Sequence, residues 1–262
     1  MQKALPGVPM VAVYDTAFHQ TMPKKNYLYP VPMDWYTEYG VRKYGFHGTS
    51  HKFINREITA HFENENLKVI SCHIGSGASV CAINAGKVVD TSMGFSPMTG
   101  IMMGTRPGDM DPSIVTYVAE EAGMSIDEVM TMLNKHSGLE GICGKSDSRD
   151  VEDGIKAGDA KCQLAQDMYA SRVANYIAMY NNQLNGADVI VLTAGLGENS
   201  KDTRRDILAR IESLGVKLDP EKNDFRGQFR CISTDDSKIP VYVVPTNEEL
   251  MIALDTYELI NK

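Results

Sequence analysis

The sequence lacks the features that direct a chain to a membrane or to nucleic acid. No apolar run approaches the roughly 18 residues that a membrane-spanning helix needs, and the first residues, MQKALPGVPM, lack a signal peptide's long apolar region. Lysine and arginine total 26 against 34 acidic residues, so the formal charge of −8 provides no general attraction to nucleic acid or anionic lipid. We therefore expect a cytoplasmic protein that binds neither nucleic acid nor membranes.

Cysteine is also scarce. The chain has five cysteines, an odd number, and they are widely spaced and lie mostly in apolar runs. This pattern lacks the close pairing typical of a disulfide or zinc framework, and it predicts reduced side chains that lie mostly in the core. These residues are Cys72, Cys81, Cys143, Cys162 and Cys231.

The composition is otherwise that of an ordinary globular protein, with 43% hydrophobic and 23% charged residues. At roughly 100–200 residues per domain, 262 residues allow one large domain or two modest ones. Glycine is plentiful, with 22 residues, many of them beside polar residues in short loops. Such loops are what phosphate-binding sites require.

The N-terminal part of the chain predicts three features. Residues 8–14 form an apolar run that is typical of a buried strand. Residues 16–40 contain three prolines and most of the early aromatic residues, so we expect an ordered surface loop with a short helical piece near its end. Residues 50–63 have the apolar spacing of a helix.

Period-two alternation then predicts three antiparallel strands, at residues 69–73, 79–84 and 87–91. Beyond them helices alternate with strands, and a Ser125/Glu128 capping box opens one of the helices. This order predicts an α/β fold with a mixed sheet flanked by helices. We expect helices at 113–122, 125–135, 155–184, 202–214 and about 247–260, and strands at 189–192 and 241–244.

Two glycine loops are candidate phosphate sites. The first, residues 73–79, lies in a hairpin turn, where glycines let backbone N–H groups approach an anion, although they equally suit a plain turn. The second, residues 194–199, joins a buried strand to a helix, where α/β folds bind phosphorylated ligands. It is neither a Walker A loop nor GxGxxG, so a tight βα turn is the alternative. Together the two loops favour a nucleotide.

Two further segments, each containing an arginine, are candidates for contact with a nucleotide. Arg106 lies among glycine, proline and aspartate, where it could clamp a phosphate through two hydrogen bonds, or could instead be held by Asp109 or Asp111. Segment 147–149, which we expect in a loop, could contact a ribose or an adenine edge. Its alternative is a surface ion-pair cluster that contributes little.

Four further residues are candidates. His47 and His51 have a spacing that could suggest a metal pair, but no Glu or third ligand accompanies them, which favours a hydrogen-bonding histidine near an anion. Asp15 ends the apolar run at 8–14, as a site carboxylate often does, although it could cap the following loop. Glu248, at a helix start, could be stabilised by the helix dipole, or could hold Mg²⁺ directly or through water.

Taken together, these segments resemble the acetate kinase family, within the acetate and sugar kinase/actin superfamily. The matching segments occur in the family's order along the whole chain. Departures are Ser76, where the family usually has Asn, and Pro107, where Ser is common. The segments are VYDTAFHQTMP (13–23), YGFHGTSH (44–51), SMGFSP (92–97), MGTRPGDMDP (103–112), DSRD (147–150), GLGEN (195–199) and PTNEE (245–249).

The resemblance implies an actin-like (ribonuclease H-like) ATPase fold and a homodimer. It implies reversible, direct in-line phosphoryl transfer from ATP to acetate with Mg²⁺ or Mn²⁺, giving acetyl phosphate and ADP. Asp15 would be the acidic active-site residue, while His47 and Arg106 would stabilise the transition state. Phe46 and Pro97 would line the acetate pocket, and Glu248 would bind the metal. ATP would contact His73, Ile74, Gly75, Ser76, Gly77, Asp147, Ser148, Arg149, Gly195, Leu196, Gly197, Glu198 and Asn199.

The resemblance also implies a domain organisation. The chain corresponds to roughly the last two thirds of the family's chain, without the N-terminal phosphate loop and the arginine that grips the substrate carboxylate. Residues 1–66 would be the end of the first, acetate-binding domain with a connecting loop. Residues 67–262 would form the nucleotide-binding domain, whose last helix packs toward the first. Two alternatives stay open: a nucleotide-binding chain without catalysis, and a propionate or butyrate kinase relative.

Overall fold

A mixed six-stranded sheet forms the centre of the computed structural model, which describes residues 3–261. Its strand order is β3-β2-β1-β4-β6-β5. β1 pairs in parallel with β4, and β4 with β6, while the remaining pairs are antiparallel. The predicted mixed sheet and its three-stranded antiparallel start are thus confirmed. The strands are β1 (Lys68–Ile74), β2 (Ala78–Asn84), β3 (Lys87–Thr91), β4 (Val189–Thr193), β5 (Arg230–Cys231) and β6 (Val241–Val243).

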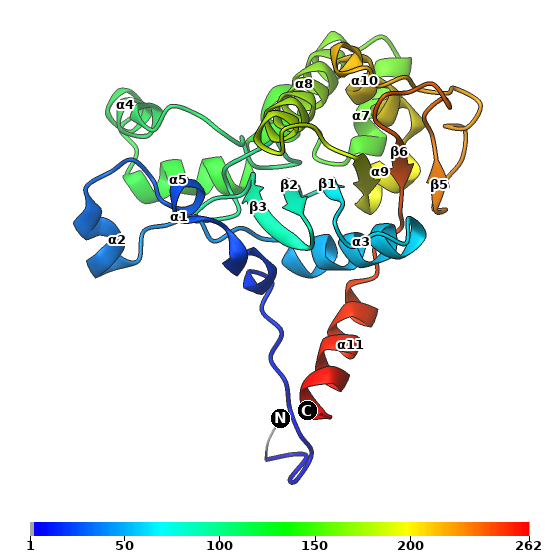
Figure 1. Ribbon diagram of the computed structural model, residues 1–262. Helices are drawn as coiled ribbons and strands as arrows, with labels where there is room; N and C mark the ends of the chain where they lie inside the picture. The colour runs from blue at the N-terminus through cyan, green and yellow to red at the C-terminus, as the bar shows by residue number, and fades with distance from the viewer. Residues whose placement is uncertain (1–2, 262) are drawn as a thin grey trace.

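Helices cover both faces of this sheet (Figure 1). Alternate residues of each strand supply the two cores: Ile70 and Cys72 belong to the larger core, while Val69 belongs to the smaller one. The larger core packs beneath α6 (Gly138–Cys143), α7 (Ser148–Lys156), α8 (Ala160–Gln183), α9 (Ala194–Asn199) and α10 (Lys201–Ala209). The smaller core packs against η1 (Ala17–Thr21) and α3 (Gly48–His61).

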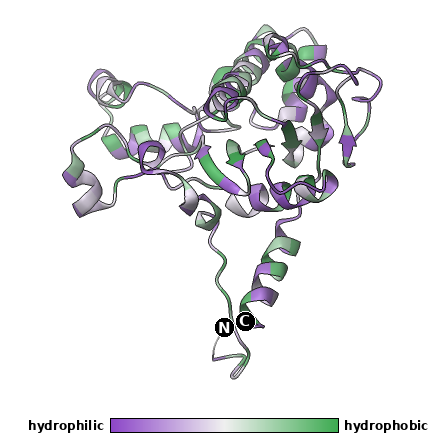
Figure 2. Ribbon diagram, viewed as in Figure 1, coloured by the Kyte–Doolittle hydropathy of each residue, from purple (hydrophilic) through white to green (hydrophobic). Residues whose placement is uncertain are grey.

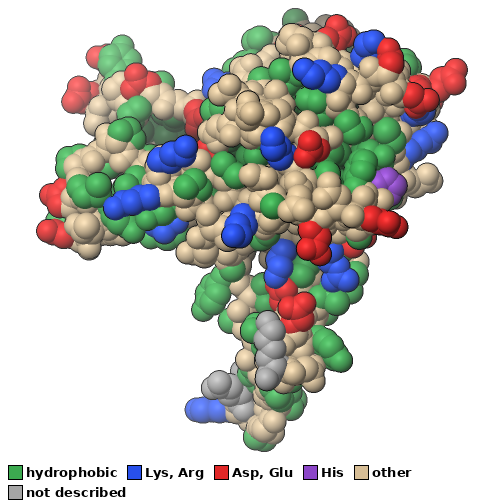
Figure 3. Space-filling view, viewed as in Figure 1, with side chains coloured by type: hydrophobic (Ala, Val, Ile, Leu, Met, Phe, Trp, Pro, Cys, Tyr) green, Lys and Arg blue, Asp and Glu red, His purple; other side chains and the backbone are tan. Residues whose placement is uncertain are grey.

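The remaining helices do not cover the faces of the sheet, although α1 (Lys24–Tyr27) contacts its edge strand β3. In Figure 1, α1, α2 (Met33–Tyr39), α4 (Ser113–Ala122) and α5 (Ile126–Lys135) form a lobe on one side. The N-terminal segment and α11 (Glu248–Ile260) both extend downward from the body. Apolar and polar stretches alternate along α11 (Figure 2), and apolar side chains are exposed on this projection (Figure 3). They include Leu5, Val8, Met10, Tyr14, Leu250, Ile252, Tyr257 and Leu259.

The strand predicted at residues 8–14 is wrong. This segment is extended, but it joins no sheet, and Val8 and Tyr14 are 53% and 70% exposed. An apolar run becomes a strand only where a neighbouring strand satisfies its backbone hydrogen bonds, and the described part of the chain supplies none here.

Two predicted helices and one strand also differ from expectation. The helix predicted at 155–184 is interrupted at Gly158, whose φ is +83°, and Asp159 caps the start of α8. The helix predicted at 202–214 ends at Ala209, followed by the 3₁₀ turn η2 (Glu212–Leu214), and the two-residue strand β5 was not predicted. In contrast, the predicted limits of α4 are reproduced, and the Ser125/Glu128 capping box at α5 is confirmed.

The cysteines have the predicted character. Among the described residues none is disulfide-bonded: Cys72, Cys81 and Cys162 are buried, and Cys143 and Cys231 are half-buried. Within residues 3–261, no helix has both the length and the apolar character that a membrane crossing would require.

Candidate functional site

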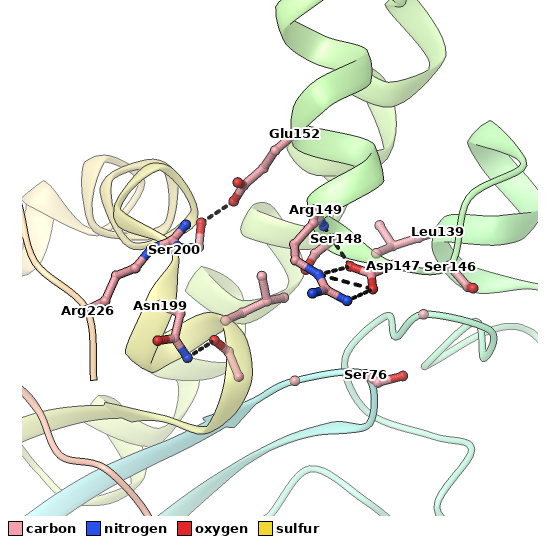
Figure 4. Close-up of a pocket in the computed structure, with 14 residues that line it drawn as sticks. Ser76, Leu139, Ser146, Asp147, Ser148, Arg149, Glu152, Asn199, Ser200 and Arg226 are labelled. Carbon is pink, nitrogen blue, oxygen red and sulfur yellow. Dashed lines mark hydrogen bonds and ion pairs between the residues drawn. The ribbon is translucent and has the colours of Figure 1, made fainter. Parts of the chain in front are cut away.

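A cavity of about 550 Å³ opens beside the carboxyl end of the sheet (Figure 4). Three segments that are distant in sequence enclose it: the β1–β2 loop, the start of α7 and the helix α9. Parallel strands commonly present ligand sites at this end of an α/β sheet. The lining residues are Gly75, Ser76, Gly104, Leu139, Ser146, Asp147, Ser148, Arg149, Glu152, Gly195, Leu196, Asn199, Ser200 and Arg226.

The second glycine loop is itself the helix α9 rather than a βα turn followed by a helix. Gly195, Leu196 and Asn199 line the cavity, but Gly197 does not. A Cβ at Gly197 would lie 3.1 Å from Cγ1 of Ile74, so this glycine allows α9 to pack closely on β1. The structure therefore assigns packing, not cavity lining, to Gly197.

Glu198 also points away from the cavity. Its Oε1 accepts hydrogen bonds from the backbone N–H groups of Ala194 at 2.8 Å and Thr246 at 3.0 Å. The carboxylate thus joins the start of α9 to the segment that follows β6. In the first glycine loop, Gly75 and Ser76 line the cavity, while His73, Ile74 and Gly77 lie outside its lining.

Segment 147–149 begins a helix that was not predicted. Asp147 caps α7 by accepting from the Arg149 N–H at 2.9 Å, and its Oδ2 lies 2.5 Å from the Arg149 guanidinium. Hydrogen bonds from Arg149 lower the pKa of Asp147 to about 2. Because the Arg149 side chain is 84% exposed, the ion pair itself contributes little stability and leaves the guanidinium free to approach a ligand.

Six cavity residues were missed from the sequence: Gly104, Leu139 and Ser146, and a further three, Glu152, Ser200 and Arg226. Glu152, one turn into α7, accepts a hydrogen bond from Ser200, which caps α10 (Figure 4). Arg226 comes from the loop that precedes β5. No motif marks the last three, because Glu152 and Ser200 occupy ordinary helix positions and Arg226 reaches the cavity only through the path of its loop.

A second group of side chains lies next to the β1–β2 loop, beyond the cavity. A Cβ at Gly77 would lie 3.5 Å from both Arg106 Nη2 and His47 Nε2, so both side chains approach this glycine. Arg106 Nη1 donates to the Pro97 carbonyl at 2.6 Å, and no carboxylate in residues 3–261 pairs with it. Its proposed restraint by Asp109 or Asp111 is therefore wrong.

Asp15 is close to the same point. Its Oδ2 accepts from the His47 backbone N–H at 2.6 Å, and its Oδ1 accepts from the Thr49 N–H at 3.4 Å. The carboxylate thus caps the start of α3, where a negative charge is stabilised by the helix dipole. It also fixes His47, whose φ of +56° is uncommon for a residue other than glycine.

The two candidate histidines do not form a metal pair. His47 Nδ1 lies 2.9 Å from the Ser79 hydroxyl, and His51 Nε2 lies 2.8 Å from the same hydroxyl. The other His51 nitrogen is bonded to Ser71 at 2.8 Å. Within the described residues, no group of three or more His, Cys, Asp or Glu side chains could hold a metal ion. The preference for a hydrogen-bonding role over zinc therefore agrees with the geometry.

The remaining predicted residues lie around this group. Phe46 is half-buried against the larger core, and its carbonyl accepts a hydrogen bond from His19 at 2.8 Å. Pro97 contributes the carbonyl that holds Arg106. Glu248 begins α11, where burial and the nearby negative charges of Asp15 and Glu249 raise its pKa.

The buried histidines predict a pH-dependent stability. Burial lowers the pKa of His47 to about 4, against nearby Asp15, and lowers the pKa values of His19, His51 and His73 as well. The unfolded chain therefore binds more protons below about pH 6.5. We expect the free energy of unfolding to be fully present above that pH and to fall as the pH is lowered from about 6.5 to 4. His47 contributes about 1.4 kcal/mol per pH unit to this fall, and the other three histidines act in the same direction.

Urea unfolding at pH 7 and pH 5 would measure this loss. The variant His47→Gln removes one of the four groups, so its stability should fall less steeply over the same interval. If the variant and the unaltered chain lost the same free energy between the two pH values, the assignment of His47 as a buried neutral histidine would be incorrect.

Comparisons with known proteins identify relatives of this chain. The profile described as "Acetokinase family" matches residues 1–254. A curated acetate kinase of Carboxydothermus hydrogenoformans is 54% identical over 262 residues, and the match covers 99% of this chain and 66% of that protein. The chain thus spans about two thirds of the length of the curated relatives that it matches.

Solved structures with the same fold belong to related kinases. The crystal structure of Porphyromonas gingivalis acetate kinase has a TM-score of 0.96 and 42% identity, and the match covers 99% of this chain and 66% of that one. A propionate kinase from Francisella tularensis has a TM-score of 0.92 and 42% identity, with 96% and 65% covered. This likeness confirms the predicted fold class.

Proposed function

This chain is a member of the acetokinase family, and on that premise we propose that it acts in phosphoryl transfer between ATP and acetate. The products are ADP and acetyl phosphate, and the reaction is reversible. One observation carries the proposal. Gly77 lies in the glycine loop that lines part of the cavity, Arg106 and His47 both approach it, and Arg106 has no carboxylate partner within residues 3–261.

The cavity has the volume and lining that a nucleotide requires. With the base and ribose beside Arg149, Asn199 and Arg226, the phosphates would run past Gly75 and Ser76. Backbone N–H groups of glycine loops favour such anions. The terminal phosphoryl group would then reach the position between Arg106 and His47.

Phosphoryl transfer needs positioning and charge stabilisation more than covalent chemistry. Arg106, fixed by the Pro97 carbonyl, would neutralise charge on the transferred group, and His47 would donate a hydrogen bond to one of its oxygens. Asp15 holds the His47 backbone in place for this role. Direct in-line transfer to a carboxylate oxygen of acetate requires no covalent enzyme intermediate.

A divalent metal, Mg²⁺ or Mn²⁺, fits beside Glu248. The observation that supports it is electrostatic: burial, and then the negative charges of Asp15 and Glu249, raise the pKa of Glu248, and a divalent cation would offset both effects. Glu248 would hold the metal, directly or through water. When bound, the metal would neutralise charge on the nucleotide phosphates.

We also propose the acceptor, assembly and domain limits implied by the family. Phe46 and Pro97 would form walls of a pocket for a short acid, with acetate preferred, and propionate as the alternative that the propionate kinase neighbour favours. We propose a cytoplasmic homodimer. Residues 67–262, which contain every strand of the described sheet, would form the nucleotide-binding domain, with α11 packing toward the acetate-binding side formed in part by residues 1–66.

The direct test uses the 262-residue chain with acetate, Mg-ATP and hydroxylamine, which traps acetyl phosphate as a hydroxamate. Hydroxamate and ADP formed in equal amounts would support the proposal. Calorimetric titration with ATP separates the alternative, because binding without turnover would identify a nucleotide-binding chain without catalysis. Neither binding nor turnover would contradict both.

Gly77 provides a sharper test of where transfer occurs. Its φ is not in the left-handed region, and an added Cβ would make ordinary 3.5 Å contacts, so Gly77→Ala should fold with a stability change within about 1 kcal/mol. The methyl group would nevertheless occupy space beside Arg106 and His47. We expect kcat/KM to fall on the order of 10²-fold, with nucleotide binding retained. Unchanged turnover would place transfer elsewhere.

A further inference from the structure

Four buried or half-buried side chains form a continuous hydrogen-bonded row behind the site. His47 Nδ1 contacts the Ser79 hydroxyl at 2.9 Å, Ser79 contacts His51 Nε2 at 2.8 Å, and His51 Nδ1 contacts the Ser71 hydroxyl at 2.8 Å. Ser71, Ser79 and His51 are fully buried. The row therefore connects Ser71, a buried side chain of β1, to the histidine that faces Gly77.

The protons in this row can be counted. Burial lowers the pKa of His47 to about 4 and that of His51 well below its ordinary value, so both rings are neutral near pH 7 and carry one N–H each. Asp15, Arg106, His19 and the stacked ring of His73 are the other charged or titratable groups around His47. Each serine hydroxyl supplies one hydrogen. Because a serine oxygen can accept two hydrogen bonds, three arrangements then give every contact one donor and one acceptor.

In the first arrangement, His47 donates from Nδ1 to Ser79, Ser79 donates to His51, and His51 donates to Ser71. The Ser71 hydrogen is then left over, and within the described residues the Ser71 hydroxyl has no side-chain contact besides His51. In the second, Ser71 donates to His51, His51 donates to Ser79, and Ser79 donates to His47 Nδ1. The third differs from the second only in that His47 donates from Nδ1 to Ser79. It leaves the Ser79 hydrogen over, and within the described residues that hydroxyl contacts only His47 and His51. The second arrangement alone leaves no hydroxyl hydrogen of the row unpaired, so it is favoured.

The second arrangement has a direct consequence for the site. With Nδ1 acting as acceptor, the hydrogen of His47 must reside on Nε2, the nitrogen that approaches Gly77 and Arg106. A hydrogen on Nε2 can be donated to an anionic oxygen, whereas a bare Nε2 would repel one. The first and third arrangements would leave that nitrogen bare.

We propose that Ser79, supported by His51 and Ser71, is a positioning residue that holds His47 in the Nε2–H tautomer, ready to donate to the transferred phosphoryl group. The identity of that group rests on the proposed function, whereas the tautomer does not. The direction of donation along the row, from Ser71 toward His47, is set by the Ser71 and Ser79 hydroxyls, which have no other acceptor among the described residues.

Nitrogen-15 NMR of the histidine rings in the 262-residue chain tests the tautomer without substrates, because protonated and bare ring nitrogens differ widely in chemical shift. His47 is assigned by its loss in His47→Gln. We expect the Nε2–H tautomer in the unaltered chain. In Ser79→Ala and Ser71→Ala we expect the bias to fall roughly five- to tenfold, the weight of one ordinary hydrogen bond.

Two further variants are controls. Ser79→Thr retains the hydroxyl and should retain the tautomer. Ser92→Ala removes another buried hydroxyl, which bonds to the Val80 N–H and to no histidine, and should leave the His47 signals in place. If Ser79→Ala does not fold, Ser71→Ala still decides. A bare Nε2 in the unaltered chain, or an unchanged tautomer in both alanine variants, would overturn the proposal.

Kinetics provide a second readout. If the chain turns over acetate, Ser79→Ala should lower kcat on the order of 10²-fold, as loss of one transition-state donor does, with little change in the KM for ATP. A change in KM alone would contradict a positioning role. If the chain does not turn over, the NMR result still stands, so the two proposals fail separately.

Discussion

Replacing Arg106 with alanine is expected to lower acetyl phosphate formation by roughly 10³-fold or more, the effect of removing an arginine that stabilises a phosphoryl transition state. The geometry gives the reason. Arg106 is fixed by the Pro97 carbonyl at 2.6 Å, approaches Gly77 and has no ion-pair partner in the described chain. Its charge is therefore available for the transferred group. Hydroxamate formation by the purified variant measures the loss.

Two variants define the specificity of that result. Arg106→Lys keeps the charge but not the planar fork that reaches both the Pro97 carbonyl and the site, so it should recover only part of the activity. Arg210→Ala removes a surface arginine that pairs with Asp167 and should retain activity. Equal turnover by Arg106→Ala and the unaltered chain would exclude Arg106 from the chemistry.

Replacing Arg204 with methionine is expected to have the largest effect on folding, a loss of about 4 kcal/mol or more in the free energy of unfolding. Arg204 is fully buried without a carboxylate partner among the described residues, and desolvation lowers its pKa to about 10. Its guanidinium donates to Asn223, to the carbonyls of Gly197 and Glu198 at 3.1 and 3.0 Å, and to that of Phe225 at 3.1 Å. Methionine would leave these acceptors unpaired.

The same contacts connect stability to the cavity. Arg204 joins the end of α9 to the loop that carries Arg226, so nucleotide affinity should fall along with stability. Arg205→Ala is the matched control, because this neighbour is 57% exposed and pairs only with Asp202 and Asp206 on the surface; its stability should change by less than about 1 kcal/mol. Similar urea midpoints for both variants would contradict the role assigned to Arg204.

Much of the fold could be predicted because local chemistry decides it. The strands of the hairpin follow from period-two alternation, and α5 follows from the Ser125/Glu128 box. The errors occurred where a segment's structure depends on other parts of the chain or on a single backbone conformation. Residues 8–14 have the composition of a strand but no strand beside them, and Gly158 interrupts what looked like one long helix. The left-handed backbone of Gly158 ends the helix there, although the apolar periodicity continues on both sides of it.

The site shows the same division. Arg106, His47 and Gly77 stood in recognisable segments, but their approach to one point depends on how those segments are folded together. Residue type alone could not show that Gly197 and Glu198 serve packing and a backbone link rather than the cavity. Arg226 had no motif, because its place in the cavity depends on a loop held by a buried arginine. Ser79 lies in the first glycine loop, but its role depends on a contact between β2 and the start of α3, which the motif does not reveal.

The order of strands in the sheet has a consequence for folding kinetics. β1, β2 and β3 are joined by short turns, whereas β4 reaches β1 only after the long excursion from Thr91 to Val189. Local hairpins close fast, and pairing between distant segments closes slowly. Because the cavity spans that late junction, from the β1–β2 loop to α9, we expect it to assemble in the final stage of folding. A ligand bound there would therefore slow unfolding more than it speeds folding.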